Sequence, residues 1–138
     1  MRVVLDTNIL ISALISHSGM PYQCLKLWDR GHYRLVTSSW QIEELRDVTR
    51  RDVLKPYIKR VEVGKFVNEM RKKAIVQQTL PTIDVSPDPD DNNIIATAIV
   101  GEANYIVSGD KEDVLALDKI ESIRILTARK FVGLFNSY

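Results

Sequence analysis

Short apolar runs alternate with segments of helical periodicity along most of the chain. Runs rich in β-branched residues at 2–5, 33–37, 105–107 and 122–126 predict buried strands. Stripes with a helical period predict helices at 9–15, 21–30, 91–101 and 127–135, a helix from Ser38 or Ser39 to 51, and one helix or a pair over 56–78. Residues 82–85 are expected to form a short extended piece.

The order of these elements predicts the fold class. Strands that alternate with helices are typical of a parallel sheet with helices on both faces. The sequence therefore predicts an α/β protein, a three-layer α/β/α sandwich whose central, mainly parallel sheet has about four to five strands. We expect one domain over residues 1–138, because the sequence contains no repeat, linker or low-complexity segment.

The composition of the chain indicates in which cellular compartment the protein is expected. With 45% hydrophobic and 27% charged residues, the chain is an ordinary globular protein. A charged residue occurs within the first six positions, so we expect no signal peptide, and no apolar run is long enough to span a bilayer. The single cysteine, Cys24, excludes an internal disulfide and is interpreted as a small apolar residue on the inner face of a helix. These features favour a cytoplasmic protein without a membrane partner.

Charge is unevenly distributed, although the net charge is only +1. Residues 82–118 carry nine acids and a single base, Lys111, whereas residues 41–75 carry ten bases and six acids. An acidic pocket beside a basic surface suits a metal enzyme that acts on a polyanion. The alternative is that the bases form the solvated faces of two charged helices.

Two acids follow directly after predicted strands. Asp6 ends the first apolar run, and Asp110 follows the run at 105–107. In parallel sheets, ligands bind outside the carboxyl ends of the strands, so both acids are candidates for a site. The alternative for Asp6 is a helix N-cap, although Thr7 or Asn8 could cap that helix instead. Asp113 fits a surface turn almost as well as a site.

Two more acids lie on the inner faces of predicted helices. Glu44 shares a face with Trp40 and Val48, and Asp91 begins the apolar line of its helix. Buried acids need a partner, which favours a site, although Glu44 could instead lie at an edge or pair with a buried base.

The turn before Asp91 contains further acids. Asp88 is the second candidate in this Asp-Pro-Asp-Asp cluster, and Asp90 is assigned to capping of the helix.

A cluster of carboxylates without histidine or cysteine suits Mg²⁺ or Mn²⁺ as the cofactor. Carboxylates crowded at one end of a sheet repel one another unless a cation lies between them. No histidine is placed as a nucleophile or general base, so the sequence predicts hydrolysis by metal-activated water, with a phosphodiester as the best-fitting substrate.

Four motifs in order, VVLDTNIL, SSWQIEEL, DPDDNNIIATAI and YIVSGDKEDVLAL, resemble those of the PIN-domain nucleases over residues 2 to 135. The resemblance implies a metal site formed by the acids that match Asp6, Glu44, Asp91 and Asp110, which the acid at Asp113 sometimes joins. It also implies that Asn8 helps to order Asp6. Ser108 stands where the family usually has threonine, which keeps the hydroxyl.

The resemblance further implies an active enzyme that cleaves single-stranded or structured RNA with Mg²⁺ or Mn²⁺. Small members of the family are often the toxin of a toxin–antitoxin pair and commonly form homodimers, so an antitoxin and a second copy are the expected protein partners. Arg46, Arg50 and Arg51 follow Glu44 on the same helix and are candidates for phosphate contacts with RNA.

Two other functions compete with the nuclease. A PIN-like module that binds RNA or protein without cutting is one alternative, and the complete set of acids argues against it. A phosphotransfer fold is the other. It would need a second aspartate two residues after Asp6, which the chain lacks, and a lysine at a later strand end, for which only Lys111 is available.

Overall fold

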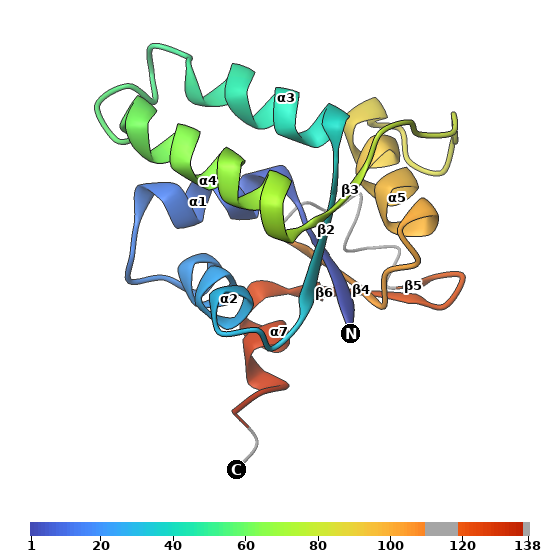
Figure 1. The fold of residues 1–138 in the computed structure, drawn as a ribbon. Coiled ribbons are helices and arrows are strands. Elements are labelled where there is room, and N and C mark those ends of the chain that lie inside the picture. The colour runs from blue at the N-terminus through green and yellow to red at the C-terminus, as the bar shows by residue number, and fades with distance from the viewer. Residues whose placement is uncertain (110–118, 137–138) are drawn as a thin grey trace.

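A twisted sheet runs through the centre of the molecule between two layers of helices (Figure 1). The computed structural model describes residues 1–109 and 119–136. Within these ranges the sheet has six strands in the order β3-β2-β1-β4-β6-β5. The strands are β1 Arg2–Leu5, β2 Arg34–Ser38, β3 Ile75–Gln77, β4 Tyr105–Ser108, β5 Lys119–Ile120 and β6 Ile123–Thr127. All neighbours are parallel except β5 and β6, which are antiparallel.

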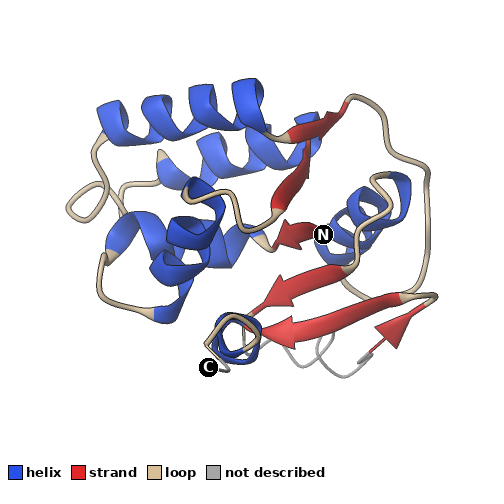
Figure 2. Cartoon of the chain, turned by 60° about the horizontal axis from the view of Figure 1, so that its bottom comes forward, coloured by secondary structure: helices blue, strands red, loops and turns tan. Residues whose placement is uncertain are grey.

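Helices cover both faces of this sheet (Figure 2). They are α1 Thr7–Ile15, α2 Met20–Asp29, α3 Ser39–Thr49, α4 Arg60–Lys73, α5 Pro89–Val100 and α7 Ala128–Gly133. Side chains of α1, α2, α3, α4 and α7 form the larger core with one face of the sheet. The helix α5 forms the smaller core on the other face. The predicted three-layer α/β/α class is therefore confirmed.

The strand β1 shows why the apolar runs are continuous. Val3 and Leu5 belong to the larger core, whereas Val4 between them belongs to the smaller one. Successive side chains of a strand point to opposite faces, so a strand covered on both faces must be apolar at every position. All three side chains have no exposed surface.

The structure differs from the prediction at the edges of the sheet. Residues 75–77 form β3 instead of continuing the helix expected over 56–78, and α4 covers only 60–73 of that range. Residues 82–85 form no strand. Edge strands of two or three residues, such as β5 and β3, are too short to leave a periodic signal, so the sheet has six strands in the described ranges where four to five were predicted.

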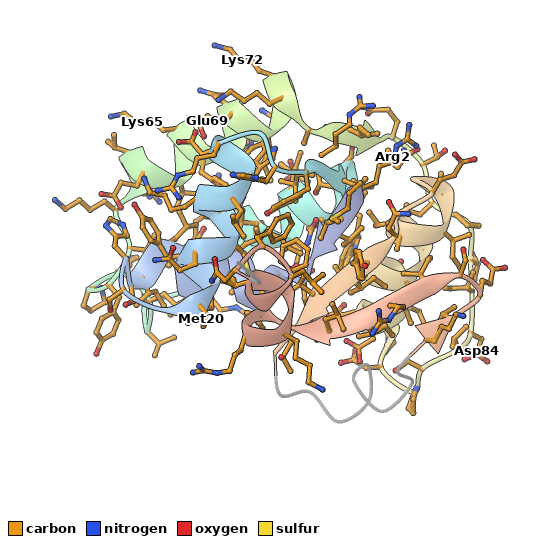
Figure 3. All side chains as sticks on the ribbon, turned by 90° about the horizontal axis from the view of Figure 1, so that it is seen from below. Arg2, Met20, Lys65, Glu69, Lys72 and Asp84 are labelled. Carbon is orange, nitrogen blue, oxygen red and sulfur yellow. The ribbon has the colours of Figure 1, made fainter. Side chains whose placement is uncertain are left out.

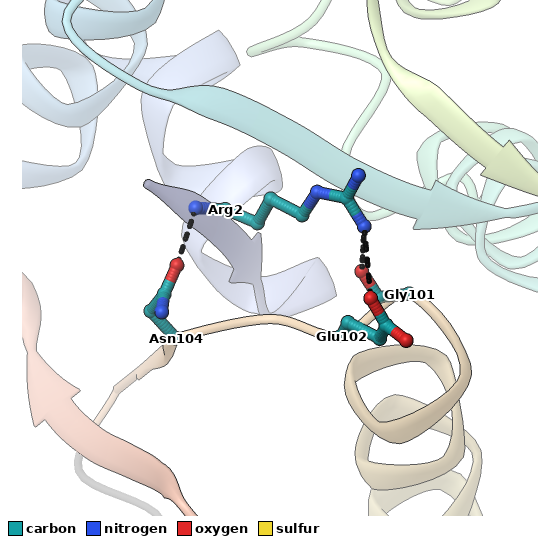
Figure 4. Close-up of polar contacts among 4 residues, drawn as sticks. All are labelled: Arg2, Gly101, Glu102 and Asn104. Atoms are coloured by element: carbon teal, nitrogen blue, oxygen red, sulfur yellow. Dashed lines mark hydrogen bonds and ion pairs between the residues drawn. The ribbon is translucent and has the colours of Figure 1, made fainter.

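The amino-terminal ends of the strands are tied together by Arg2 (Figure 4). Its backbone N–H donates to Oδ1 of Asn104 over 2.8 Å, and its Nη1 donates to the carbonyl of Gly101 over 3.1 Å. The ion pair with Glu102, at 3.7 Å, involves a largely exposed carboxylate and contributes little. These contacts hold β1 against the turn between α5 and β4, which helps to set the register that pairs Leu5 with Val107.

Two expectations about the whole chain can be compared with the structure. Cys24 is fully buried on the inner face of α2, as predicted, and burial raises the pKa of its thiol to about 12. Among the helices in the described ranges, none is long and apolar enough to cross a bilayer.

Close packing between α5 and β2 depends on Gly101. A Cβ at this position would overlap Cγ1 of Val36 and approach the carbonyl oxygen of Thr97 to 3.0 Å. We therefore expect Gly101→Ala to lower the free energy of unfolding by about 1–3 kcal/mol, as measured by urea denaturation. Gly64→Ala is the matched control. It lies within α4 with no atom within 4 Å of its Cβ, and it should stabilise the protein by up to about 1 kcal/mol. Equal stability of Gly101→Ala and wild type would show that α5 and β2 separate easily.

Candidate active site

The candidate acids in the described part of the chain lie near the edge of the sheet at which β1, β2 and β4 end. These strands are parallel, so their carboxyl ends lie side by side. The helix α1 follows β1 directly, and α3 follows β2. In Figure 1, α3 begins beside the upper end of α5, and the two helices are in contact. Asp6, Glu44 and Asp91 therefore approach this edge from three different elements.

Asp6 is held at the end of β1. The residue is only 2% exposed, and its carboxylate accepts a hydrogen bond from the hydroxyl of Ser108, with 3.1 Å between Oγ and Oδ2. Its backbone N–H donates to the carbonyl of Val107 over 2.9 Å, which extends the pairing between β1 and β4. Asp6 occupies the N-cap position of α1, but its side chain makes no capping bond with any described residue. The N-cap alternative therefore does not account for Asp6.

Glu44 connects α3 to the start of α1. The side chain is half-buried, and its Oε2 accepts a hydrogen bond from the hydroxyl of Thr7 over 3.0 Å. Asn8, the residue expected to order Asp6, is exposed. Its expected role in ordering Asp6 stays a prediction.

A fully buried glutamine, which the sequence did not single out, supports this arrangement. Nε2 of Gln41 donates to the carbonyl of Leu5 over 2.6 Å, and its Oε1 accepts from the hydroxyl of Thr37 over 2.6 Å. The same Nε2 lies 3.5 Å from the hydroxyl of Thr7 that binds Glu44. One amide thus joins the ends of β1 and β2 to α3. The sequence signal that could have identified Gln41 is its position three residues before Glu44, on the apolar side of the predicted helix.

The start of α3 is fixed by a second buried contact. Ser38 is the N-cap residue, and its hydroxyl accepts from the backbone N–H of Gln41 over 3.1 Å. Thr97 of α5 donates its own hydroxyl to Ser38 over 3.1 Å. The first turn of α3 is therefore anchored to both the sheet and α5, which positions the face that carries Glu44.

Asp91 lies in the first turn of α5 and is 1% exposed. Its Oδ2 is 3.4 Å from the hydroxyl of Ser86, which donates to it. The next residue, Asn92, holds the preceding loop. Its Oδ1 accepts from the backbone N–H groups of Val85 and Ser86, and its Nδ2 donates to the carbonyl of Ser86 over 2.8 Å. The loop therefore places Ser86 against Asp91.

Two further acids of this cluster lie at the N-terminus of α5. Asp88 is the N-cap of α5, and its Oδ1 accepts from the backbone N–H of Asp90 over 2.9 Å. The capping assignment made for Asp90 is therefore wrong, because Asp90 lies within the first turn of the helix and is exposed. Asp110 and Asp113 lie outside the described residues.

The donor set suits a hard cation. It is made of carboxylate oxygens, and no described Lys or Arg forms an ion pair with the buried Asp6. Within residues 1–109 and 119–136, however, no three acid, histidine or cysteine side chains lie close enough together to hold a metal ion. The described acids fit the chemistry of Mg²⁺ or Mn²⁺ without completing a binding site by themselves.

The three arginines proposed for RNA contact are near the end of α3. Arg46 is half-buried, whereas Arg50 and Arg51 are exposed. None of the three forms an ion pair with a residue in the described part of the chain.

Comparisons with known proteins agree with this architecture. A family model described as PIN domain matches residues 2–112. The uncharacterized protein MJ1680 of Methanocaldococcus jannaschii is 27% identical over 145 residues, which cover 99% of this chain and 93% of that protein. The crystal structure of VapBC2 from Rickettsia felis, bound to a DNA fragment from their promoter, has a similar fold. The TM-score is 0.59 at 18% identity, over 92% of this chain and 98% of that one.

The role of Gln41 can be tested by removing its amide. Gln41→Leu leaves the carbonyl of Leu5 and the hydroxyl of Thr37 buried without this partner, so we expect the free energy of unfolding to fall by about 1–3 kcal/mol. The measurement is urea denaturation, with Gln78→Leu as control. Gln78 is exposed at the end of β3, and its substitution should change stability by no more than about 0.5 kcal/mol. Equal effects of the two substitutions would contradict this role.

Proposed function

The chain belongs to the PIN-domain family of nucleases, and from this premise we propose that it is a metal-dependent ribonuclease. Asp6, Glu44, Asp91 and Asp110 would hold Mg²⁺ or Mn²⁺, with Asp88 and Asp113 as further candidates. The observation that carries the proposal is the approach of Asp6, Glu44 and Asp91 to one edge of the sheet, two of them almost fully buried. Burial of ionised carboxylates is costly, so it is uncommon unless a cation or a chemical role requires it.

Each of these three acids receives a hydrogen bond from a hydroxyl group. Ser108 donates to Asp6, Thr7 to Glu44 and Ser86 to Asp91. A donated hydrogen bond stabilises the ionised carboxylate and fixes the direction of one of its oxygens. These bonds therefore orient the acids, as the ligands of a cation must be oriented.

A divalent cation bound there would supply a nucleophile from water at neutral pH and would neutralise charge on the phosphodiester. The chain's own contribution is to orient the acids and to bury Asp6 and Asp91. Gln41 and Ser38 hold α3 against the strand ends, and Asn92 holds the loop that precedes α5. These contacts fix the elements that carry Glu44 and Asp91 at this edge of the sheet.

We extend the proposal to the substrate and partners. Arg46, Arg50 and Arg51 are proposed to contact RNA phosphates from α3. The proposal includes a role as the toxin of a toxin–antitoxin pair in the cytoplasm, as a homodimer that binds an antitoxin. The likeness of the fold to VapBC2 supports the toxin role. A PIN-like module that binds without cutting is the competing function. The observation on the side of this binding module is that no three acid, histidine or cysteine side chains among the described residues lie close enough together to hold a metal ion.

Cleavage of a mixed pool of labelled RNAs decides between the two functions. We expect the purified protein to cut RNA with Mg²⁺ or Mn²⁺ and to be inactive in EDTA. Asp91→Asn should reduce the cleavage rate by more than about 100-fold, because a missing metal ligand costs at least as much as a missing supporting partner. The circular dichroism spectrum should be unchanged.

Asp90→Asn is the matched control, since it makes the same substitution at the exposed neighbour and should retain the wild-type rate. Full activity of Asp91→Asn would refute the assignment of the site. No cleavage by wild type, with no Mn²⁺ binding by calorimetry, would favour the binding module.

A further inference from the structure

A groove between α3 and α4 is lined by arginines from both helices, and we propose that it binds the phosphates of single-stranded RNA. This inference rests on the proposed ribonuclease function and names where its substrate is held. The groove has a volume of about 470 Å³. Among the described residues, the bases that line it are Arg46, Arg50, Arg60 and Arg71. Arg60 and Arg71 come from a helix for which the sequence predicted no RNA contact.

The spacing of the arginines places those of each helix on the side that lines the groove. Arg46 and Arg50 are four residues apart and therefore lie on one side of α3. Along α4, Arg60, Gly64 and Arg71 follow a single stripe. Val63 and Val67, which belong to the larger core, form the apolar floor between them. The groove is thus built into the packing of two helices and does not depend on a loop.

The positive charge of the groove is not neutralised by the described residues. No acid lines it, and none of its four arginines forms an ion pair within the described ranges. Lys73, in contrast, forms an ion pair with Asp29. Lys65 and Lys72 extend from α4 into solvent (Figure 3). Four guanidinium groups that face one hollow without a counter-charge favour a polyanion as the ligand.

The groove shares a helix with the candidate active site. Glu44 points toward α1 from one side of α3, and Arg46 and Arg50 line the groove on another. A helix with its side chains is about 10–12 Å across, so a strand that crosses α3 reaches both. Arg71 also lines a smaller hollow with Glu43, Ser39 and Gln78. Ser39 and Gln78 directly follow β2 and β3, so Arg71 connects the groove to the edge of the sheet where the strands end.

The lining also indicates which part of the RNA is recognised. A guanidinium group matches the geometry of phosphate oxygens with two parallel hydrogen bonds. No aromatic side chain lines the described groove, so it offers no ring on which a base could stack. The contacts should therefore be to the backbone and tolerate any sequence. An acidic protein segment would also match the charge, but the position of the groove on the helix of Glu44 favours the substrate.

The test measures binding separately from cleavage. A fluorescent oligouridine is titrated with the Asp91→Asn protein in EDTA, so neither metal nor turnover contributes. We expect Arg50→Gln/Arg60→Gln in this background to weaken binding by about tenfold at roughly 0.1 M salt. The slope of the logarithm of the binding constant against the logarithm of the salt concentration should become less steep by about 1.4. Each phosphate of a single strand that is no longer neutralised lowers this slope by about 0.7, and two arginines are removed. The control, Arg30→Gln/Arg129→Gln, removes the same charge from exposed positions on other elements and should bind within about twofold of its parent.

A second pair of variants tests the groove without changing its charge. The Cβ of residue 64 would meet no atom within 4 Å, so a larger side chain there can occupy the groove. Gly64→Leu should weaken binding of the oligouridine, whereas Gly64→Ala should leave it unchanged. Weaker binding by Gly64→Leu and by the arginine pair, with both controls intact, would support the proposal.

Three results would overturn it: wild-type binding by Gly64→Leu, equally weakened binding by the two arginine pairs, or displacement of oligouridine by polyglutamate at equal charge concentration. The last result would identify an acidic protein segment as the occupant. Because cleavage is scored in a different experiment, a groove that fails to bind RNA in an enzyme that cuts it would refute only this inference. A groove that binds RNA in a protein that never cuts would refute only the ribonuclease.

Discussion

The position of β1 between two parallel neighbours is the constraint on which the rest of the structure depends. This strand pairs with β2 on one side and with β4 on the other, and its side chains pack into both cores. The register of β1 is therefore fixed by both neighbouring strands and by both cores, because a slip by one residue would move every side chain to the opposite face of the sheet. Asp6 leaves the end of this strand, and its contact with Ser108 is a direct result of the pairing with β4.

Among the described residues, contacts between hydroxyl groups, amides and acids hold the site together. Asp6 and Asp91 are among the most buried polar residues of the described chain, and Gln41, Ser38 and Thr97 are buried with them. Such a network is stable only when its members satisfy one another, because an unmatched polar group in a core is costly. The same requirement makes the network rigid, and rigidity is what a set of metal-binding oxygens needs.

Much of this arrangement was predictable because it follows from the local periodicity of apolar residues in the sequence. The central strands and the faces that carry Glu44 and Asp91 follow from spacings of two and four residues. Gln41 was not predictable in the same way, since its partner Leu5 is 36 residues away and the bond depends on how α3 meets the sheet. The arginine groove was missed for a similar reason. It exists only because α3 and α4 pack against each other, and neither helix alone indicates which of its bases face the other.

The two ends of β1 have different roles. Arg2 and Asn104 secure its beginning, next to the close contact between Gly101 and Val36, whereas the acids gather at its end. A strand of four residues spans roughly 13 Å, and substitutions separated by more than about 7–10 Å usually have additive effects on stability. Evolution or design can therefore strengthen the beginning of the strand to compensate for changes at its end. The chemistry of this protein can diversify while the thermal tolerance of its scaffold is adjusted independently.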